Sequence, residues 1–557
     1  STYNAVLNAN PNNATIWQGE GGYSTNGDNG NLNFDAGESF SQILKGSHEL
    51  DIHYDGMGVF VRGMYYYDFA MMDSDRDWTN QLSGQMNDPC NDSEAKKQVC
   101  TDIRLLDAYV YGNFDLGEMP FSIRVGQQVI SWGESTLIGH GISEINPVDI
   151  ARLKAPGAEL KEAFIPFGAV WASLGITENV NVEAFYQYSW EKTVLPPPGS
   201  YFSTNDFAGD GGHNNNAQLG FSGNPDIDIN FLLAGLNQIG DMVRSGDPAT
   251  IASAAQAYLA YPTKVTLRSP GKSAEWEPYD GGQYGLRLSV YLPELNETEL
   301  SFYYVNYHSR RPLFSGKMAN FKTETLLGDL LTTGQLGGDL AYLGGNQITE
   351  DNLYTNLSAF SHVKLAYPED IAMYAMSFNT TFGETAFAGE ISYRQDEPLQ
   401  IDDVELLFAA MPQQLANAGL RPELDNISQF NDPLTGQPFE SSSIANGFVL
   451  SDTVQAQMTI THLFGPTLGA SQFVGLVEIG GININDMPDE DVLRLNGPGT
   501  ARNGGIATAP GLEIPLQNGV ETNPFPTEFA WGYKIVGKLD YTNVFAGVNM
   551  SPRVVFS

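Results

Sequence analysis

The chain has 557 residues with 66 acidic and 28 basic side chains, and its net charge of -38 excludes a surface for the phosphate backbone of nucleic acids. It contains no run of 18 or more apolar residues, which excludes transmembrane helices. A transmembrane β-barrel passes that test, because only every second residue of its strands faces lipid.

The first 46 residues are rich in Asn and Gly and show no sustained alternation of apolar and polar residues. They predict an extended N-terminal segment, a plug inside a barrel or a periplasmic tail, and these alternatives stay open. Four oxygen-bearing side chains have a spacing loosely like that of a calcium loop, without the full EF-hand pattern: Asp28, Asn31, Asp35 and Glu38. Ca²⁺ is therefore a candidate cofactor here and in the other acidic loops, the alternative being a solvated rim.

From residue 47 to the end, apolar and polar residues alternate in segments of about ten residues. A period of two places one set on each face of a strand. An apolar outer face and a polar inner face predict an all-β fold, a transmembrane antiparallel β-barrel of about 14–18 strands. The apolar row is clearest at Val59, Val61, Gly63, Tyr65, Tyr67 and Phe69; at Leu106, Ala108, Val110, Gly112 and Phe114; and at Val454, Ala456, Met458 and Ile460.

The connections between the predicted strands alternate between short turns and long excursions. Gly, Asn, Asp and Pro mark the short turns, which lie near residues 55–58, 115–120, 175–179, 292–297, 367–370, 465–471 and 540–543. The long excursions span 70–103, 131–168, 191–282, 309–357, 395–452 and 481–527. Short turns face the periplasm and long loops face outward in outer-membrane barrels. The pattern therefore predicts a protein embedded in the outer-membrane lipid of a Gram-negative bacterium.

One place breaks this rhythm. Residues 371–382 and 386–394 both have the pattern of strands around a tight turn at 383–385, directly after the short connection at 367–370. Two short turns in succession would move the next excursion to the periplasmic side, unless another strand lies within 395–452.

Three excursions contain helical periodicity, in residues 229–260, 323–342 and 402–419. Their apolar faces predict amphipathic helices. Each face needs a partner, which is another helix, the inner wall of the barrel or a bound apolar ligand.

The two cysteines, Cys90 and Cys100, lie ten residues apart in one predicted loop. Cysteines so close together in an exported chain predict a local disulfide. Redox catalysis would need the tighter Cys-x-x-Cys spacing.

The excursion 131–168 carries acidic and basic residues in close succession. Folded into the lumen, it would form a plug with an ion-paired constriction, because opposed charges in a narrow pore create a transverse field and set a size limit. The alternative is an ordered external loop held by the same pairs. The residues predicted to shape the lumen are Arg124, Trp132, Glu134, Asp149, Arg152 and Glu159.

Several motifs are distributed over essentially the whole chain: Asp28–Phe40, Leu50–Phe69, Gly126-Gln127-Gln128 with Trp132-Gly133-Glu134, Asn146-Pro147-Val148-Asp149, Pro156-Gly157-Ala158-Glu159, Tyr367-Pro368-Glu369-Asp370 and Gly389–Arg394. They resemble a proteobacterial family of uncharacterised outer-membrane barrels. Genes of that family often neighbour RND-type transporters, and similar proteins occur in settings of steroid, hydrocarbon and lipid metabolism. The resemblance implies a barrel, traffic of hydrophobic molecules and a periplasmic or RND-type partner, and it transfers no catalytic residue.

An enzyme is not expected, because the seven histidines have no metal-binding spacing and Ser135 lacks a Gly-x-Ser-x-Gly elbow. The leading hypothesis is an outer-membrane channel or transporter for hydrophobic or amphipathic small molecules or lipids. The alternatives are a surface-exposed barrel whose acidic loops bind a partner or cations, and a general water-filled porin.

Overall fold

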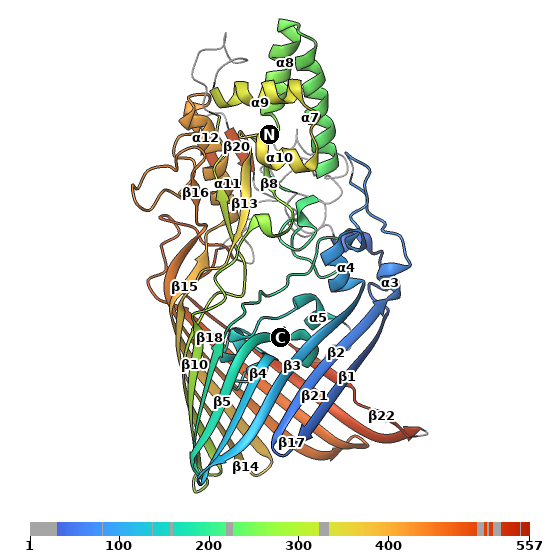
Figure 1. Ribbon diagram of the computed structural model, residues 1–557, viewed down its shortest axis with the longest axis vertical. Helices are drawn as coiled ribbons and strands as arrows, with labels where there is room; N and C mark the ends of the chain where they lie inside the picture. Colours follow the sequence, from blue (N-terminus) through green and yellow to red (C-terminus); the bar gives the residue numbers. More distant parts are fainter. Residues whose placement is uncertain are drawn as a thin grey trace.

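The computed structural model describes residues 30–557 except 81, 136, 156–159, 215, 219–226, 322–333, 498–505, 510–511, 516–524 and 546. A large curved sheet of slanted strands forms one end of the molecule, and a smaller layer of helices and short strands lies beyond its other end (Figure 1). No helix in this described part of the chain is long and apolar enough to cross a membrane.

The large sheet has 15 strands, and each strand runs antiparallel to the strands with which it pairs. The strand order follows the chain: β1 (Ile43–Tyr54), β2 (Met57–Asp68), β3 (Thr101–Leu116), β4 (Met119–Gln128), β5 (Phe167–Thr177), β6 (Val180–Gln187), β10 (Gln283–Leu292), β11 (Thr298–Tyr307), β14 (Ile371–Phe382), β15 (Thr385–Gln400), β17 (Phe448–Thr467), β18 (Ala470–Ile484), β21 (Phe529–Phe545) and β22 (Val548–Met550), with β23 (Arg553–Phe556) also on β21. Among the described strands, β1 pairs with β2 alone, so no backbone pairing joins the first strand to the last.

The predicted alternation separates an exposed apolar row from a buried polar row on β17. Gln455, Gln457 and Thr459 are buried, whereas Ala456 and Met458 between them are exposed. The concave side of the sheet therefore carries the polar row.

The predicted apolar row on β3 is wrong at Leu106, which is buried. The register between β2 and β3 shifts there, because two residues of β3 lie opposite Arg62 of β2. Such a bulge inserts one extra residue and changes which side chains share a face. Ile103 and Leu105 are consequently the exposed residues before the bulge, and Val110 continues the exposed row after it.

The rhythm of short turns and long loops is unbroken in the described residues. Residues 361–366 belong to a small separate sheet, and the connection at 367–370 leads from that sheet back to β14. The excursion between β11 and β14 therefore runs from 308 to 370, and the tight turn after β14 lies at the short-turn end. The turn predicted at 540–543 is also displaced, since β21 continues to Phe545.

The long loops build a cap of short strands and helices (Figure 1). Its sheet contains β16 (Ile444–Ala445), β12 (Leu313–Lys317), β13 (Ser361–Ala366), β8 (Val265–Arg268), β7 (Ala217–Gln218) and β9 (Glu275–Trp276), and β19 (Ile506–Ala509) pairs with β20 (Leu512–Pro515). Its helices are α7 (Ile229–Arg244), α8 (Pro248–Leu259), α9 (Gly334–Gly345), α10 (Glu350–Asn356), α11 (Asp403–Ala410) and α12 (Pro412–Asn417), with the 3-10 turns η4 (Gly212–Asn214), η5 (Gly271–Ala274) and η6 (Pro422–Leu424).

The apolar helix faces pack mainly on one another and on the small sheet. Leu232 and Leu236 of α7, Tyr258 of α8 and Leu343 of α9 share one buried cluster. Self-packing is therefore the observed partner of these faces. Residues 323–333 of the predicted helix 323–342 lie outside the described residues.

Short elements line the loop end of the first strands. They are η1 (Gly30–Asn33), α3 (Phe69–Met72), η2 (Pro89–Asn91) and α4 (Ser93–Val99). Asn33 donates hydrogen bonds to the carbonyls of Asn87 and Gly199, both 2.9 Å long. The described part of the N-terminal segment therefore packs against loops at this rim.

Candidate functional site

The segment between β4 and β5, residues 129–166, folds against the concave face of the sheet; we call it the inner segment. It contains η3 (Ile142–Ile145), α5 (Ile150–Lys154) and α6 (Leu160–Ala163), and residues 136 and 156–159 of it are not described. Figure 1 shows α5 among the strands near the loop end of the sheet.

Apolar packing holds one side of the inner segment to the wall. Trp132, Ile142 and Ile145 are buried in a cluster with side chains of β5, β6, β11 and β14: Phe167, Ala169, Phe185, Tyr303, Val305, Tyr307, Ile371 and Met373. Trp132 also donates its indole N–H to Glu183 of β6 over 2.8 Å. These residues form an apolar patch in an otherwise polar inner row, and the inner segment covers it.

Two buried carboxylates hold the opposite side of the segment. Glu390 of β15 accepts the backbone N–H groups of Glu134 at 2.6 Å and Ile142 at 2.9 Å. It also accepts the side-chain amide of Gln457 at 2.6 Å. Hydrogen bonds to an ionised acceptor are about twice as strong as neutral ones, so Glu390 is a tether for the segment.

Glu478 of β18 is the second tether. Its side chain is fully buried and accepts the backbone N–H groups of Leu137 at 2.9 Å and Ile138 at 2.7 Å. Lys534 of β21, its register partner, donates to the carbonyl of Leu137 at 2.7 Å. The segment is thus fixed to β6 on one side of the concave face and to β18 on the other.

A buried arginine adds a third anchor. Arg394 of β15 donates to the backbone carbonyls of His140 and Gly141, at 2.6 and 2.8 Å. Gln455 donates to the carbonyl of Gly139 at 3.1 Å. Backbone N–H or C=O groups of residues 134, 135 and 137–142 therefore find partners on the wall, which an irregular segment in a confined space requires.

The predicted lumen residues fall into separate places. Trp132 and Glu134 lie in the part of the segment that faces β6 and β15, where Asn379 of β14 donates to the Glu134 carboxylate at 3.1 Å. Burial raises the pKa of the Glu134 carboxyl. Asp149 and Arg152 lie instead at the other end of the segment, beside β3 and α4.

Asp149 has two structural partners. Its carboxylate accepts the backbone N–H of Arg152 at 3.0 Å, which caps α5, and it accepts Arg104 of β3 at 2.9 Å. Arg104 also pairs with Asp102 at 2.7 Å. The predicted constriction with ion pairs inside the segment is therefore replaced by pairs between segment and wall, of which Lys45 with Glu162 is another.

Arg124 lies on the inner row of β4, and it is linked to Trp132 through Trp171 and Glu183, which accepts the indole N–H groups of both tryptophans. Its guanidinium stacks on Trp171 of β5, with 3.9 Å from Cζ to the ring centroid. Nearer the short turns, a recess of about 1510 Å³, counted with its opening, is lined by Glu118, Glu178, Glu183, Glu299 and Arg287 among others. The concave side at this end is thus open and mainly acidic.

Three predicted residues cannot be placed fully. Glu159 and Asp28 lie outside the described residues, and the side chain of Asn31 is not described. Asp35 and Glu38 form a local turn, in which the Asp35 N–H donates to the Glu38 carboxylate at 3.2 Å. Within the described residues, no group of three or more His, Cys, Asp or Glu could hold a metal ion. Ca²⁺ binding by the first loop stays a prediction.

Cys90 and Cys100 form a disulfide with an S–S distance of 2.00 Å, in agreement with the prediction. Sequence reasoning did not select Glu390, Glu478 or Arg394. A usable signal was present, because Glu390 and Arg394 alternate with Ser392 on one face of β15, and Glu478 is the one charged residue in the sequence of β18.

Solved structures with very low sequence identity are similar to this chain. The outer-membrane channel DcaP of Acinetobacter baumannii is 9% identical with a TM-score of 0.32, and the match covers 96% of this chain and 86% of that one. OpdK of Pseudomonas aeruginosa, solved with vanillate, is 9% identical with a TM-score of 0.29, covering 92% and 86%. OmpT, an outer-membrane protein of Vibrio cholerae, is 8% identical with a TM-score of 0.26, covering 93% and 94%.

No curated protein matches the sequence. One family model matches almost the whole sequence, over residues 2–557. The chain belongs to the family described as protein of unknown function (DUF1302).

Proposed function

We propose that this protein is an outer-membrane β-barrel channel whose lumen is narrowed by the inner segment. The observation that carries the proposal is the placement of that segment: residues 132–145 contact β6, β11 and β14 on one side and β15, β18 and β21 on the other. A segment bound to opposite walls divides the space between them.

The convex face of the sheet supports a location in the membrane. Large apolar side chains are exposed along strand after strand, among them Val110 on β3, Phe302 on β11, Ile391 on β15 and Ile479 on β18. A water-soluble monomer rarely exposes so extended an apolar surface, whereas the lipid face of a barrel requires it. No described element covers this face, and the outer membrane of a Gram-negative bacterium is the compartment where such barrels occur.

The cargo follows from the chemistry near the loop end. We infer a hydrophobic or amphipathic small molecule, because aromatic side chains gather at the rim beside the inner segment: Phe40, Tyr201 and Phe202. A periplasmic partner, including an RND-type system, would meet the short-turn end, where the acidic recess opens. Co-purification of the protein with its periplasmic neighbours after in-cell crosslinking tests this partnership.

The acidic recess also favours a second candidate, a water-filled porin. Charged walls hold water and favour ions over apolar molecules. The two functions predict different currents through a single protein in a planar bilayer. The narrowed channel predicts a small conductance, and a steady conductance typical of an open porin would contradict the narrowing.

The decisive experiment removes the two carboxylate tethers together. The variant Glu390→Ala/Glu478→Ala leaves backbone N–H groups of residues 134–142 without their acceptors, each loss costing about 1.5–3 kcal/mol. We expect the inner segment to leave the lumen for part of the time, and the mean conductance to rise about threefold or more with frequent switching between levels.

A matched control keeps the charge change and avoids the segment. Glu384 lies exposed in the turn between β14 and β15, and Glu528 precedes β21. Glu384→Ala/Glu528→Ala should conduct as the wild type does. Equal conductance in all three proteins would show that the inner segment does not limit the current, and recovery of the protein from inner-membrane or soluble fractions would overturn the proposed location.

A further inference from the structure

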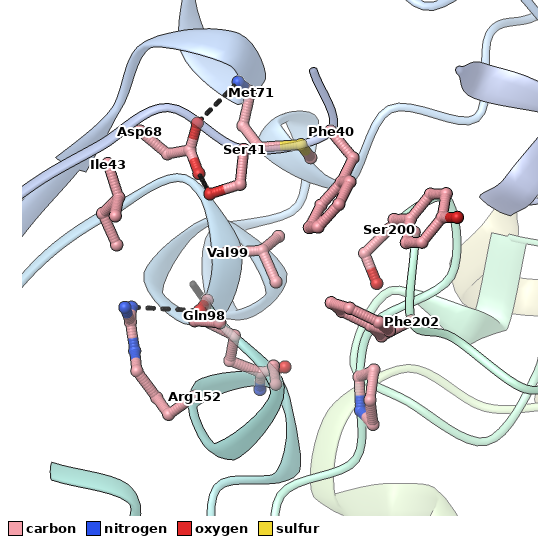
Figure 2. A pocket seen from close by; sticks show the side chains of 14 residues that line it. Phe40, Ser41, Ile43, Asp68, Met71, Gln98, Val99, Arg152, Ser200 and Phe202 are labelled. Carbon is pink, nitrogen blue, oxygen red and sulfur yellow. Dashed lines mark hydrogen bonds between the residues drawn. The ribbon is translucent and has the colours of Figure 1, made fainter. Parts of the chain in front are cut away.

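A cavity lies at the loop end of β1 and β2, between α4, α5 and the loop 196–202. Its volume is about 470 Å³, counted with its open mouth. In Figure 2, Phe40 and Phe202 lie on one side of the cavity and Arg152 lies on the other, with Gln98 and Val99 between them. The cavity thus joins the rim of the sheet to the inner segment, which supplies Arg152.

Among the described residues, no carboxylate forms an ion pair with the Arg152 guanidinium. The residue is 4% exposed, and its Nη2 donates only to the carbonyl of Gln98 at 3.0 Å. No hydrogen-bond acceptor is found for its buried Nε. Asp149, the nearest acidic residue in the chain, pairs with Arg104 instead.

One face of the Arg152 guanidinium stacks on the ring of Tyr66 of β2, with 3.3 Å from Cζ to the ring centroid. This contact does not neutralise the positive charge. Burial lowers the pKa of Arg152, although Tyr66, Asp149 and Asp102 act in the opposite direction. A buried charge is normally paired or bound to a ligand. The guanidinium of Arg152, whose Nε has no acceptor among the described residues, therefore needs one.

The other lining residues define the rest of the ligand. Phe40 stacks on Tyr201 with ring centroids 4.4 Å apart, and Phe202 meets Phe40 edge-on at 5.2 Å. Ile43, Met71 and Val99 complete an apolar wall. Such a wall favours a flat or aliphatic body attached to the group that binds Arg152.

Among the described residues, Asp68 is the one carboxylate that lines the cavity. It is already the acceptor for Ser41, for the backbone N–H of Gln42 at 3.0 Å and for that of Met71 at 3.2 Å. These hydrogen bonds hold the Asp68 carboxylate on the side of the cavity nearest β1.

We propose that this cavity binds a small carboxylate with an aromatic or aliphatic body, as an entrance subsite of the channel. The carboxylate accepts from Arg152, and the body lies against Phe40 and Phe202. The role as an entrance subsite rests on the proposed channel function. The cavity then identifies the cargo as amphipathic acids. The planar guanidinium suits this group better than a lysine would, because it presents donors in the plane of a carboxylate.

The test measures binding of 4-(trifluoromethyl)benzoate to the full chain in detergent micelles by ¹⁹F NMR. The neutral 4-(trifluoromethyl)benzamide is the probe control. We expect saturable binding of the acid to the wild type, at least tenfold weaker binding to Arg152→Gln, and equally weak binding of the amide to both proteins.

Arg244→Gln is the matched protein control, since Arg244 lies on the exposed face of α7 and pairs with Asp241. It should bind the acid as the wild type does. Phe202→Ala tests the site without touching the guanidinium and should weaken binding about threefold or more. It also keeps the test valid if Arg152→Gln fails to fold, which heat-modified gel mobility reveals.

Three results would overturn the proposal: no saturable binding to the wild type, equal affinity of wild type and Arg152→Gln, or equal affinity of acid and amide for the wild type. The measurement uses solubilised protein and needs no conductance. Failure of the subsite is therefore distinguishable from failure of the channel, which the bilayer experiment tests separately.

Discussion

A buried histidine in the cap couples its stability to pH. His362 of β13 is 8% exposed, and its register partner Lys317 and the neighbouring Lys364 share its face of the small sheet. Burial and these two lysines lower its pKa from 6.5 to about 4. Because the pKa is lower in the folded state, the stabilisation is complete above about pH 6.5 and is lost as the pH falls towards 4.

We predict that His362→Gln removes this pH dependence of stability. In the wild type, the free energy of unfolding should fall by about 3 kcal/mol when the imidazole becomes protonated. Hydrogen exchange of residues 361–366 at pH 4.5 and 7.5, corrected for the intrinsic rate, measures it as the difference between variant and wild type. Burial raises the pKa of Asp403 of α11 to about 6, so Asp403 stabilises the cap at low pH, opposite to His362. Its contribution is the same in both proteins and cancels in the difference between them. The exposed His53 supplies the control His53→Gln, and a matching pH dependence in wild type and His362→Gln would contradict the assignment.

At the scale of elements, the disulfide closes a loop around α4. Asp92 caps this seven-residue helix through the N–H groups of Glu94 and Ala95, and Cys100 follows its last turn. A helix this short is unstable by itself. The cross-link therefore keeps Gln98 and Val99 in place as a wall of the cavity beside Arg152.

We predict that Cys90→Ser/Cys100→Ser loosens α4 locally, since closing a loop of this size stabilises the fold by about 3 kcal/mol in the chain-entropy account. Hydrogen exchange of residues 93–99 should quicken by tenfold or more, while that of β3 stays as in the wild type. Reduction of the wild type should reproduce the effect. Unchanged exchange in both cases would mean that packing alone holds the helix.

At the scale of the whole molecule, the exposed apolar face decides where the protein resides. Val110 lies midway along β3 with 53% of its surface exposed. Arginine at the middle of a lipid-facing strand costs about 2–4 kcal/mol, whereas near the ends of the strand the cost falls to about 0–1 kcal/mol.

We predict that Val110→Arg destabilises the folded protein in lipid vesicles by about 2–4 kcal/mol. Equilibrium unfolding in urea with vesicles present measures this, read from gel mobility. Leu434→Arg is the control, because Leu434 is 93% exposed in a loop of the cap, and it should have no effect. Equal stability of both variants would place Val110 outside the lipid.

The sequence by itself determined most strands of the large sheet, most of their short turns and the exposed row of most strands, although the connection at 367–370 and the turn at 540–543 were wrong. This follows because alternation is a local property, and the row Gln455, Gln457 and Thr459 is buried as its period of two predicts. The bulge at Leu106 escaped, since one extra residue leaves the composition of the strand almost unchanged.

Only the tertiary structure decided which residues hold the inner segment. Glu134 and Glu390 are 256 residues apart in the chain, and Leu137 and Glu478 are 341 apart, so no local pattern links them. The same holds for Arg152, which the sequence placed among the charges of an ion-paired constriction. The structure gives Asp149 to Arg104 and leaves Arg152 facing a cavity, because burial and neighbours, which spacing along a chain does not encode, set the partner of each charge.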